Sequence, residues 1–177
     1  MEKEKPCCGW EPQREPQEKA PERELHLDFL YLDLTQCGRC QGTEASLEGA
    51  LEDVSAVLKS AGYQVILNKV NIRTRELAIR HRFISSPTIR INGRDIALEF
   101  RESLCQDCGD LCGDQVDCRV WVYEGEEYDQ PPREMIVNAI LKEVYGSGQE
   151  AAPGAGGYEL PANLEAFFQG LEKKEPQ

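Results

Sequence analysis

The stretch LHLDFLYLDLTQCGRC, residues 25–40, joins a strongly apolar segment to two cysteines spaced C-x-x-C. Apolar side chains fall on both sides of the alternating pattern over residues 25–34, which predicts a central strand covered by helices on each face. Cys37 and Cys40 follow at the start of a helix-like segment. The partial positive charge of a helix N-terminus stabilises a thiolate, so this position favours a reactive thiol.

Apolar periodicity and turn signals predict the elements that follow. They are a helix over 41–61, a strand over 63–72, a shorter helix over 74–83, strands over 88–91 and 95–100 around the turn signal Asn92-Gly93, a small hairpin of 119–123 and 126–128, and a last long helix over 132–145. Strands joined through a helix run parallel, whereas a hairpin adds antiparallel partners. The sequence therefore predicts an α/β fold with a mixed sheet and helices on both faces.

A second motif, Ser86-Pro87-Thr88, lies directly before the predicted strand over 88–91. Together with the C-x-x-C at the first strand–helix junction, it makes residues 25–145 resemble the thioredoxin fold. Residues 86–93, SPTIRING, more closely resemble a family of uncharacterised thioredoxin-like proteins from bacteria and archaea. The resemblance implies a thioredoxin-like mixed sheet, interrupted by a cysteine-rich insertion before the last helix. It also implies that Pro87 is cis and lies beside the dithiol.

The dithiol predicts a thiol–disulfide oxidoreductase whose redox step needs no cofactor. Cys37, nearer the helix start and expected to be exposed, is the predicted attacking thiolate, and Cys40 is the predicted resolving thiol. Arg39 between them is expected to stabilise the thiolate or to steer an acidic partner. The backbone of Ser86, beside Pro87, is expected to pair with an extended substrate segment. The predicted reaction partners are a protein or small-molecule disulfide and an electron donor.

Four further cysteines lie between the predicted sheet and the last helix with the spacing C-x2-C-x3-C-x5-C, namely Cys105, Cys108, Cys112 and Cys118. A glycine after the second of them permits a tight turn, and four thiolates suit tetrahedral zinc. An iron–sulfur site, two disulfides, or a second dithiol relaying electrons to Cys37 and Cys40 are the alternatives. The second hypothesis for function is therefore a protein that binds a metal or metalloid through thiolates without redox turnover.

Charge and composition narrow the expected partners and location. The 177-residue chain has a formal net charge of −12, which argues against nucleic acid because phosphate binding needs a basic face. No apolar run approaches the roughly 18 residues of a membrane span. The charged N-terminus lacks the apolar core of a signal peptide. We therefore expect a cytoplasmic protein with mostly reduced thiols and no nucleic-acid or membrane partner.

Composition also divides the chain into segments. Residues 1–23 are charged, rich in proline and without periodicity, which predicts a disordered arm. This arm contains Cys7-Cys8, vicinal thiols that either bind a soft metal or have no function. The thioredoxin-like domain is expected over 24–146, with the insertion at about 101–131.

A Gly- and Ala-rich stretch over 147–158 predicts a flexible linker to a C-terminal tail, residues 159–177. The tail places large apolar groups, Phe167 and Phe168 among them, on one helical face. This amphipathic helix either docks into a groove of a partner protein or packs back onto the domain. Because a flexible linker transmits little packing, a chain ending at Gly146 is expected to stay folded.

Overall fold

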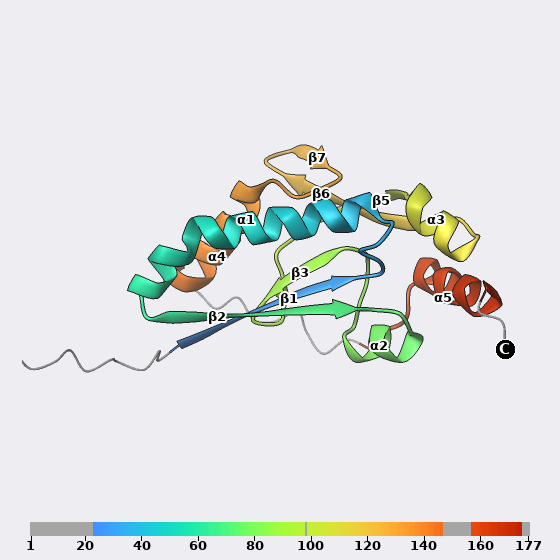
Figure 1. Ribbon diagram of the computed structural model, residues 1–177, viewed down its shortest axis with the longest axis horizontal. Coiled ribbons are helices and arrows are strands. Elements are labelled where there is room, and N and C mark those ends of the chain that lie inside the picture. Colours follow the sequence, from blue (N-terminus) through green and yellow to red (C-terminus); the bar gives the residue numbers. More distant parts are fainter. Residues whose placement is uncertain (1–22, 98, 147–156, 175–177) are drawn as a thin grey trace, which may run out of the picture.

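The computed structural model describes residues 23–97, 99–146 and 157–174 (Figure 1). Nearly all of the predicted disordered arm, including Cys7-Cys8, and most of the predicted linker lie outside the described residues. Within the described ranges, no helix is both long and apolar enough to cross a bilayer.

The described residues form seven strands and five helices. In chain order they are β1 Arg23–Tyr31, α1 Gly38–Ser60, β2 Tyr63–Asn71, α2 Arg75–Arg80, β3 Thr88–Ile91, β4 Arg94–Asp95, β5 Phe100–Leu104, α3 Gln106–Cys112, β6 Asp117–Tyr123, β7 Glu126–Tyr128, α4 Arg133–Tyr145 and α5 Ala162–Lys174. The predicted helices and the small hairpin are confirmed. The hairpin predicted around Asn92-Gly93 is present, but its second strand, predicted over 95–100, is only β4. It ends at Asp95, whose carboxylate accepts the N–H of Ala97 at 3.0 Å, and the chain turns away there. The sequence predicts no helix at α3.

The strands form two sheets, and the α/β prediction with a mixed sheet is confirmed. The first sheet has the order β2-β1-β3-β4, with β1 parallel to β2 and antiparallel to β3. The second, β5-β6-β7, is antiparallel throughout. The parallel pair follows from the helix between its strands, as the sequence predicts.

The helices cover the two faces of the first sheet unequally (Figure 1). On one face, Leu27 and Phe29 of β1 pack with apolar residues of α1 and α4. On the other, only the end of β1 is covered, where Leu30 and nearby Leu32 pack with residues of α2 and α5. His26, further back on that face, is exposed. The cysteine cluster lies beside this covered end, so the site is built on the buried part of the strand.

The prediction that the C-terminal tail is independent of the core is wrong. Leu164, Phe167 and Phe168 of α5 are at most 2% exposed and belong to the same apolar cluster as Leu30. Arg75 of α2 holds the helix from outside through an ion pair of 2.9 Å with Glu165. The apolar face predicted from the sequence is therefore covered by the chain's own domain.

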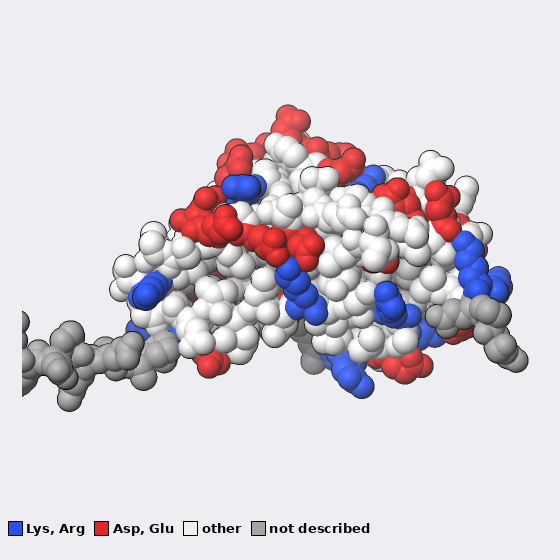
Figure 2. All heavy atoms as spheres, viewed as in Figure 1, with Lys and Arg blue, Asp and Glu red and all other residues white. Residues whose placement is uncertain are grey.

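Acidic side chains dominate the surface seen in Figure 2, where they form a band over α1. Lys69 of β2 joins two of them, with Nζ 2.8 Å from Glu44 and 2.6 Å from Glu48. The formal net charge of the whole chain is −12.

Shortening the α5 side chains is expected to destabilise the whole fold. Phe168→Ala should lower the free energy of unfolding by about 3–5 kcal/mol, because it removes a buried ring and leaves a cavity. Urea titration followed by circular dichroism measures this loss. Val57→Ala, on a side chain that is 47% exposed, is the control and should change the value by no more than about 0.5 kcal/mol. Equal midpoints for the two variants would show that α5 does not belong to the core.

Candidate metal centre

Cys37 is fixed at the start of α1 by the loop that follows β1. The Asp33 carboxylate accepts the N–H groups of Thr35 and Gln36 at 2.8 and 2.6 Å, which turns the chain into the helix. Cys37 is the N-cap residue, and its Sγ accepts the N–H of Cys40 at 3.4 Å. The predicted place at the helix start is confirmed. The predicted exposure is wrong, because Cys37 is completely buried.

The insertion brings three more cysteines together. Cys105 is the N-cap residue of α3 and Cys108 lies one helical turn further on, so their side chains share a face. The strand β6 runs back beside β5, which places Cys118 opposite Ser103, two residues before Cys105. A backbone hydrogen bond of 2.8 Å from Cys105 N to Val116 O closes this loop.

The sulfurs of Cys37, Cys105, Cys108 and Cys118 meet in one place. All four Sγ atoms lie within 4.8 Å of one another and all four residues are buried, with 3.4 Å between the sulfurs of Cys108 and Cys118. Zinc–sulfur bonds of about 2.3 Å put the ligands of a tetrahedral ion about 3.8 Å apart. The four residues therefore fit a single four-coordinate metal ion.

The four-sulfur group differs from the four cysteines predicted from the insertion, because it contains Cys37 and not Cys112. The Cys112 Sγ contacts the carbonyl oxygens of Gly109 and Asp114, both at 3.8 Å. Four residues beyond Cys108, it lies about 6 Å further along the α3 axis. There α3 packs against α5 so closely that a Cβ at Gly170 would come within 2.7 Å of the Cys112 Cβ. Cys112 is thus a packing residue between two helices.

Cys40 lies next to this group without belonging to it. Its Sγ is 3.5 Å from the Oγ of Ser86, and both residues are completely buried. The peptide bond between Ser86 and Pro87 is cis, as the resemblance implies. The dithiol and the cis proline are therefore neighbours, but neither cysteine of the dithiol faces solvent.

The contacts among the thiols divide their pKa values into two groups. Hydrogen bonds from the Cys105, Cys108 and Cys118 thiols lower the pKa of Cys37 against the opposing effect of burial. The pKa of Cys105 is also lowered, chiefly by Cys108, whereas the contact with Cys105 raises the pKa values of Cys108 and Cys118. These contacts thus favour loss of the proton from Cys37 and Cys105 and retention of the proton on Cys108 and Cys118. A bound cation would replace those protons.

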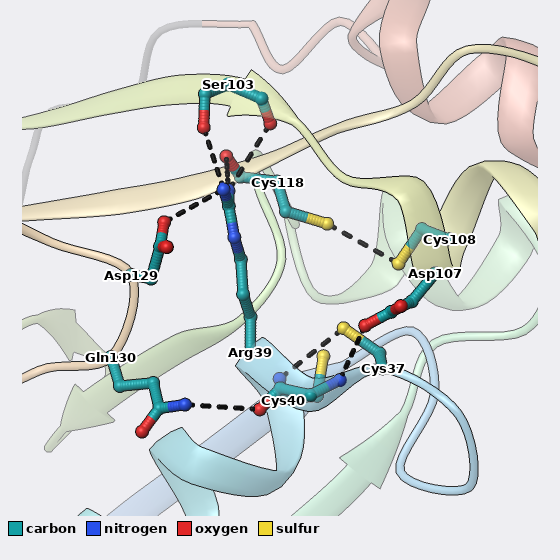
Figure 3. A network of polar contacts seen from close by, with 10 residues as sticks. Cys37, Arg39, Cys40, Ser103, Asp107, Cys108, Cys118, Asp129 and Gln130 are labelled. Carbon is teal, nitrogen blue, oxygen red and sulfur yellow. Dashed lines mark hydrogen bonds and ion pairs between the residues drawn. The ribbon is translucent and has the colours of Figure 1, made fainter.

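The backbone between the two cysteines of the C-x-x-C is bound to the insertion (Figure 3). The N–H of Gly38 donates to the Asp107 carboxylate at 2.8 Å, and the Gly38 carbonyl accepts from the Gln130 side chain at 3.5 Å. Asp107 comes directly before Cys108, so this hydrogen bond links the loop of one ligand to the loop of another. The start of α1 is held from both sides.

Arg39 holds the insertion in place, which differs from the predicted role at an open dithiol. Its guanidinium donates to the carbonyl oxygens of Ser103 and Cys118 at 3.3 and 3.2 Å, and to the Ser103 hydroxyl at 2.9 Å. A 2.8 Å ion pair with Asp129 completes its contacts (Figure 3). Only 17% of the Arg39 side chain is exposed. The cation is thus directed at the strand that carries Cys118 rather than at solvent.

The backbone carbonyl of Ser86 also has a hydrogen-bond partner within the chain. It accepts the N–H of Arg119 at 2.6 Å, so β6 takes the place that the sequence predicts for a substrate segment. The Arg119 guanidinium is completely buried, bonds the Asp95 carboxylate at 2.9 and 2.8 Å and lies 4.2 Å from the centre of the Phe100 ring. Sequence reasoning misses Arg119, because nothing in the local pattern marks a buried arginine beside Cys118.

The fold and the site define an α/β protein with a mixed four-stranded sheet, a second antiparallel sheet and a buried four-cysteine centre between them. The chain belongs to the family described as domain of unknown function (DUF2703), whose profile matches residues 25–140. No curated protein and no solved structure matches the chain. All four cysteines of the centre lie inside the matched range, and α5 lies outside it.

Replacing Arg39 is expected to loosen the insertion. Arg39→Gln removes a guanidinium that donates to two carbonyls, so the free energy of unfolding should fall by about 1–3 kcal/mol. Guanidinium chloride titration of the reduced protein measures the loss. Arg101→Gln is the matched control, because Arg101 lies in the second sheet, which Arg39 contacts, but it is 62% exposed and pairs only with Glu127 among the described residues. Comparable losses in the two variants would contradict the role assigned to Arg39.

Proposed function

We propose that this protein binds one thiophilic metal ion, zinc in the first place, through the thiolates of Cys37, Cys105, Cys108 and Cys118. The observation that carries the proposal is the meeting of four buried sulfurs from three separate segments. Four neutral thiols gain little from such convergence, whereas a metal supplies folding free energy and replaces their protons. When bound, the ion ties the start of α1 to α3 and β6.

The surroundings of the dithiol favour metal binding over exchange with protein disulfides. Cys37 and Cys40 are completely buried, so an incoming disulfide has no path to either sulfur without movement of the insertion. The Ser86 carbonyl is bonded by Arg119, and Arg39 is bonded by the strand that carries Cys118. Each group assigned to substrate binding from the sequence thus has a partner within the chain.

A thiol–disulfide oxidoreductase is the second candidate, favoured by the cis peptide bond at Pro87 beside the dithiol. The order of β1, α1, β2, the β3–β4 pair and α4, with Cys37 at the start of α1, agrees with a thioredoxin-like core. In that case the metal-free protein exchanges with a small disulfide and takes electrons from a separate donor. Both candidates need reduced thiols, which agrees with a cytoplasmic location.

Metal content after anaerobic purification tests the first candidate. We expect one zinc or iron ion per chain. Cobalt added to the metal-free protein should give the intense visible absorption of a tetrahedral site with sulfur-to-metal charge transfer. Serine in place of any one of the four ligands should weaken zinc binding by more than about 100-fold, since even the loss of an outer-shell partner costs 10–100-fold.

Cys112→Ser is the matched control for these ligand variants, because Cys112 is buried in the same insertion but is not in the group. It should bind zinc as the unaltered protein does. If Cys37→Ser keeps full affinity while Cys112→Ser loses it, the ligand set is the one predicted from the insertion alone. If reduced protein takes up neither zinc nor cobalt, metal binding is not its function. Reduction of a small aromatic disulfide by the metal-free protein, abolished in Cys37→Ser, would then support the oxidoreductase.

A further inference from the structure

Cys37 belongs to two arrangements that exclude each other. It is one of the four clustered sulfurs, and it is also the first cysteine of a C-x-x-C whose second cysteine is completely buried beside it at the start of α1. The Cys40 N–H donates to the Cys37 Sγ at 3.4 Å, which fixes that sulfur against the first turn of α1. A sulfur in a disulfide is neutral and is no longer a thiolate ligand. The metal and a Cys37–Cys40 disulfide therefore compete for one atom.

We propose that oxidation of Cys37 and Cys40 to a disulfide releases the metal, so that the centre holds its ion only while this dithiol is reduced. The inference rests on the proposed metal-binding function and adds its regulation. It assigns Cys40 the role of the thiol that removes a ligand from the site.

Position singles out Cys40 for this role. Of the described cysteines, Cys40 and Cys112 are the two outside the four-sulfur group. Cys112 lies at the far end of α3 against α5. Cys40 lies one helical turn from Cys37, at the spacing that closes a disulfide across a helix start.

Burial restricts the oxidant to a small molecule. Both sulfurs are completely buried, which excludes a protein disulfide and favours a peroxide close to water in size. The Cys37 thiolate attacks one peroxide oxygen, breaks the O–O bond and becomes a sulfenic acid, and hydroxide leaves. The Cys40 thiol then attacks the Cys37 sulfur, the S–S bond forms, and the sulfenic oxygen leaves as water with the Cys40 proton. The two sulfurs lose two electrons, and hydrogen peroxide gains them.

Trypsin offers a direct assay, because it cleaves after Arg39, between the two cysteines. Cys37 then lies on peptide 24–39 and Cys40 on peptide 40–59, while all four insertion cysteines lie on peptide 102–119. Zinc-loaded protein is treated with one equivalent of hydrogen peroxide, its remaining thiols are alkylated under denaturing conditions, and the digest is analysed by mass spectrometry. A chromogenic zinc chelator follows metal release in parallel.

We expect peptides 24–39 and 40–59 to become cross-linked at the rate at which zinc is released, one ion per chain. A dithiol reductant should remove the cross-link and restore zinc binding. A cross-link of peptide 24–39 to peptide 102–119, or zinc release without any cross-link, would overturn the assignment to Cys40.

Variants separate this inference from the function on which it rests. Cys40→Ser should bind one zinc ion in the reduced state but release it at least about tenfold more slowly in peroxide, because the resolving thiol is missing. Cys112→Ser should behave as the unaltered protein in both measurements. If Cys40→Ser releases zinc at the rate of the unaltered protein, the proposed redox switch is wrong but the proposed metal binding is not. If the reduced, unaltered protein binds no zinc, both the proposed metal binding and the proposed redox switch are wrong.

Discussion

The position of the insertion depends on the point at which four sulfur atoms from α1, α3 and β6 meet. Burial disfavours the charged form of each of these thiols, and thiolates so close together repel one another. Either retained protons or a cation must therefore balance the charge. A divalent ion bound by four thiolates does so and connects the three segments at the same time. On the proposed function, binding of the metal ion also fixes the second sheet against the core.

The contacts around the sulfurs extend this constraint to the backbone. Gly38 donates to Asp107, Arg39 donates to the Cys118 carbonyl, and each of these four residues either is a proposed ligand or lies within two residues of one. Such partners fix the direction of the ligand side chains before any ion arrives. The same contacts cover the side of the C-x-x-C on which a substrate disulfide would approach. On the proposed function, a site built in this way is preorganised for an ion and closed to a large substrate.

The local sequence predicts much of this structure, but it does not predict which cysteines form the four-sulfur group. The apolar pattern over 25–34, the turn at Asn92-Gly93 and the Ser86-Pro87 motif act over a few residues, and the elements that they predict are present. The hydrogen bonds that bring Cys37 to the insertion join residues 69 and 79 positions apart. No local spacing contains that information, so the spacing within the insertion favours Cys112, which lies outside the four-sulfur group.

Two other differences have the same origin. The segment of α3, QDCGDLC, contains a glycine and two aspartates, residues of low helix propensity, and the helix nevertheless forms where its cysteines meet the rest of the site. The apolar stripe of α5 is evident in the sequence, but a stripe does not say which surface covers it. Here α3 packs so closely on α5 that only glycine fits at position 170 beside Cys112. Tertiary contacts, rather than propensity, decide both elements.

The arrangement at Ser86 connects the two candidate functions. If the core is thioredoxin-like, the carbonyl before the cis proline is where an extended segment pairs, and the chain's own β6 pairs there through Arg119. The residue before Arg119 is Cys118, whose sulfur lies within 4.8 Å of the Cys37 sulfur. The insertion thus presents a cysteine to Cys37 from the strand that occupies the pairing edge. The edge at which an open dithiol would meet another molecule is thus occupied by the same chain, and the same arrangement brings four sulfurs together at one point.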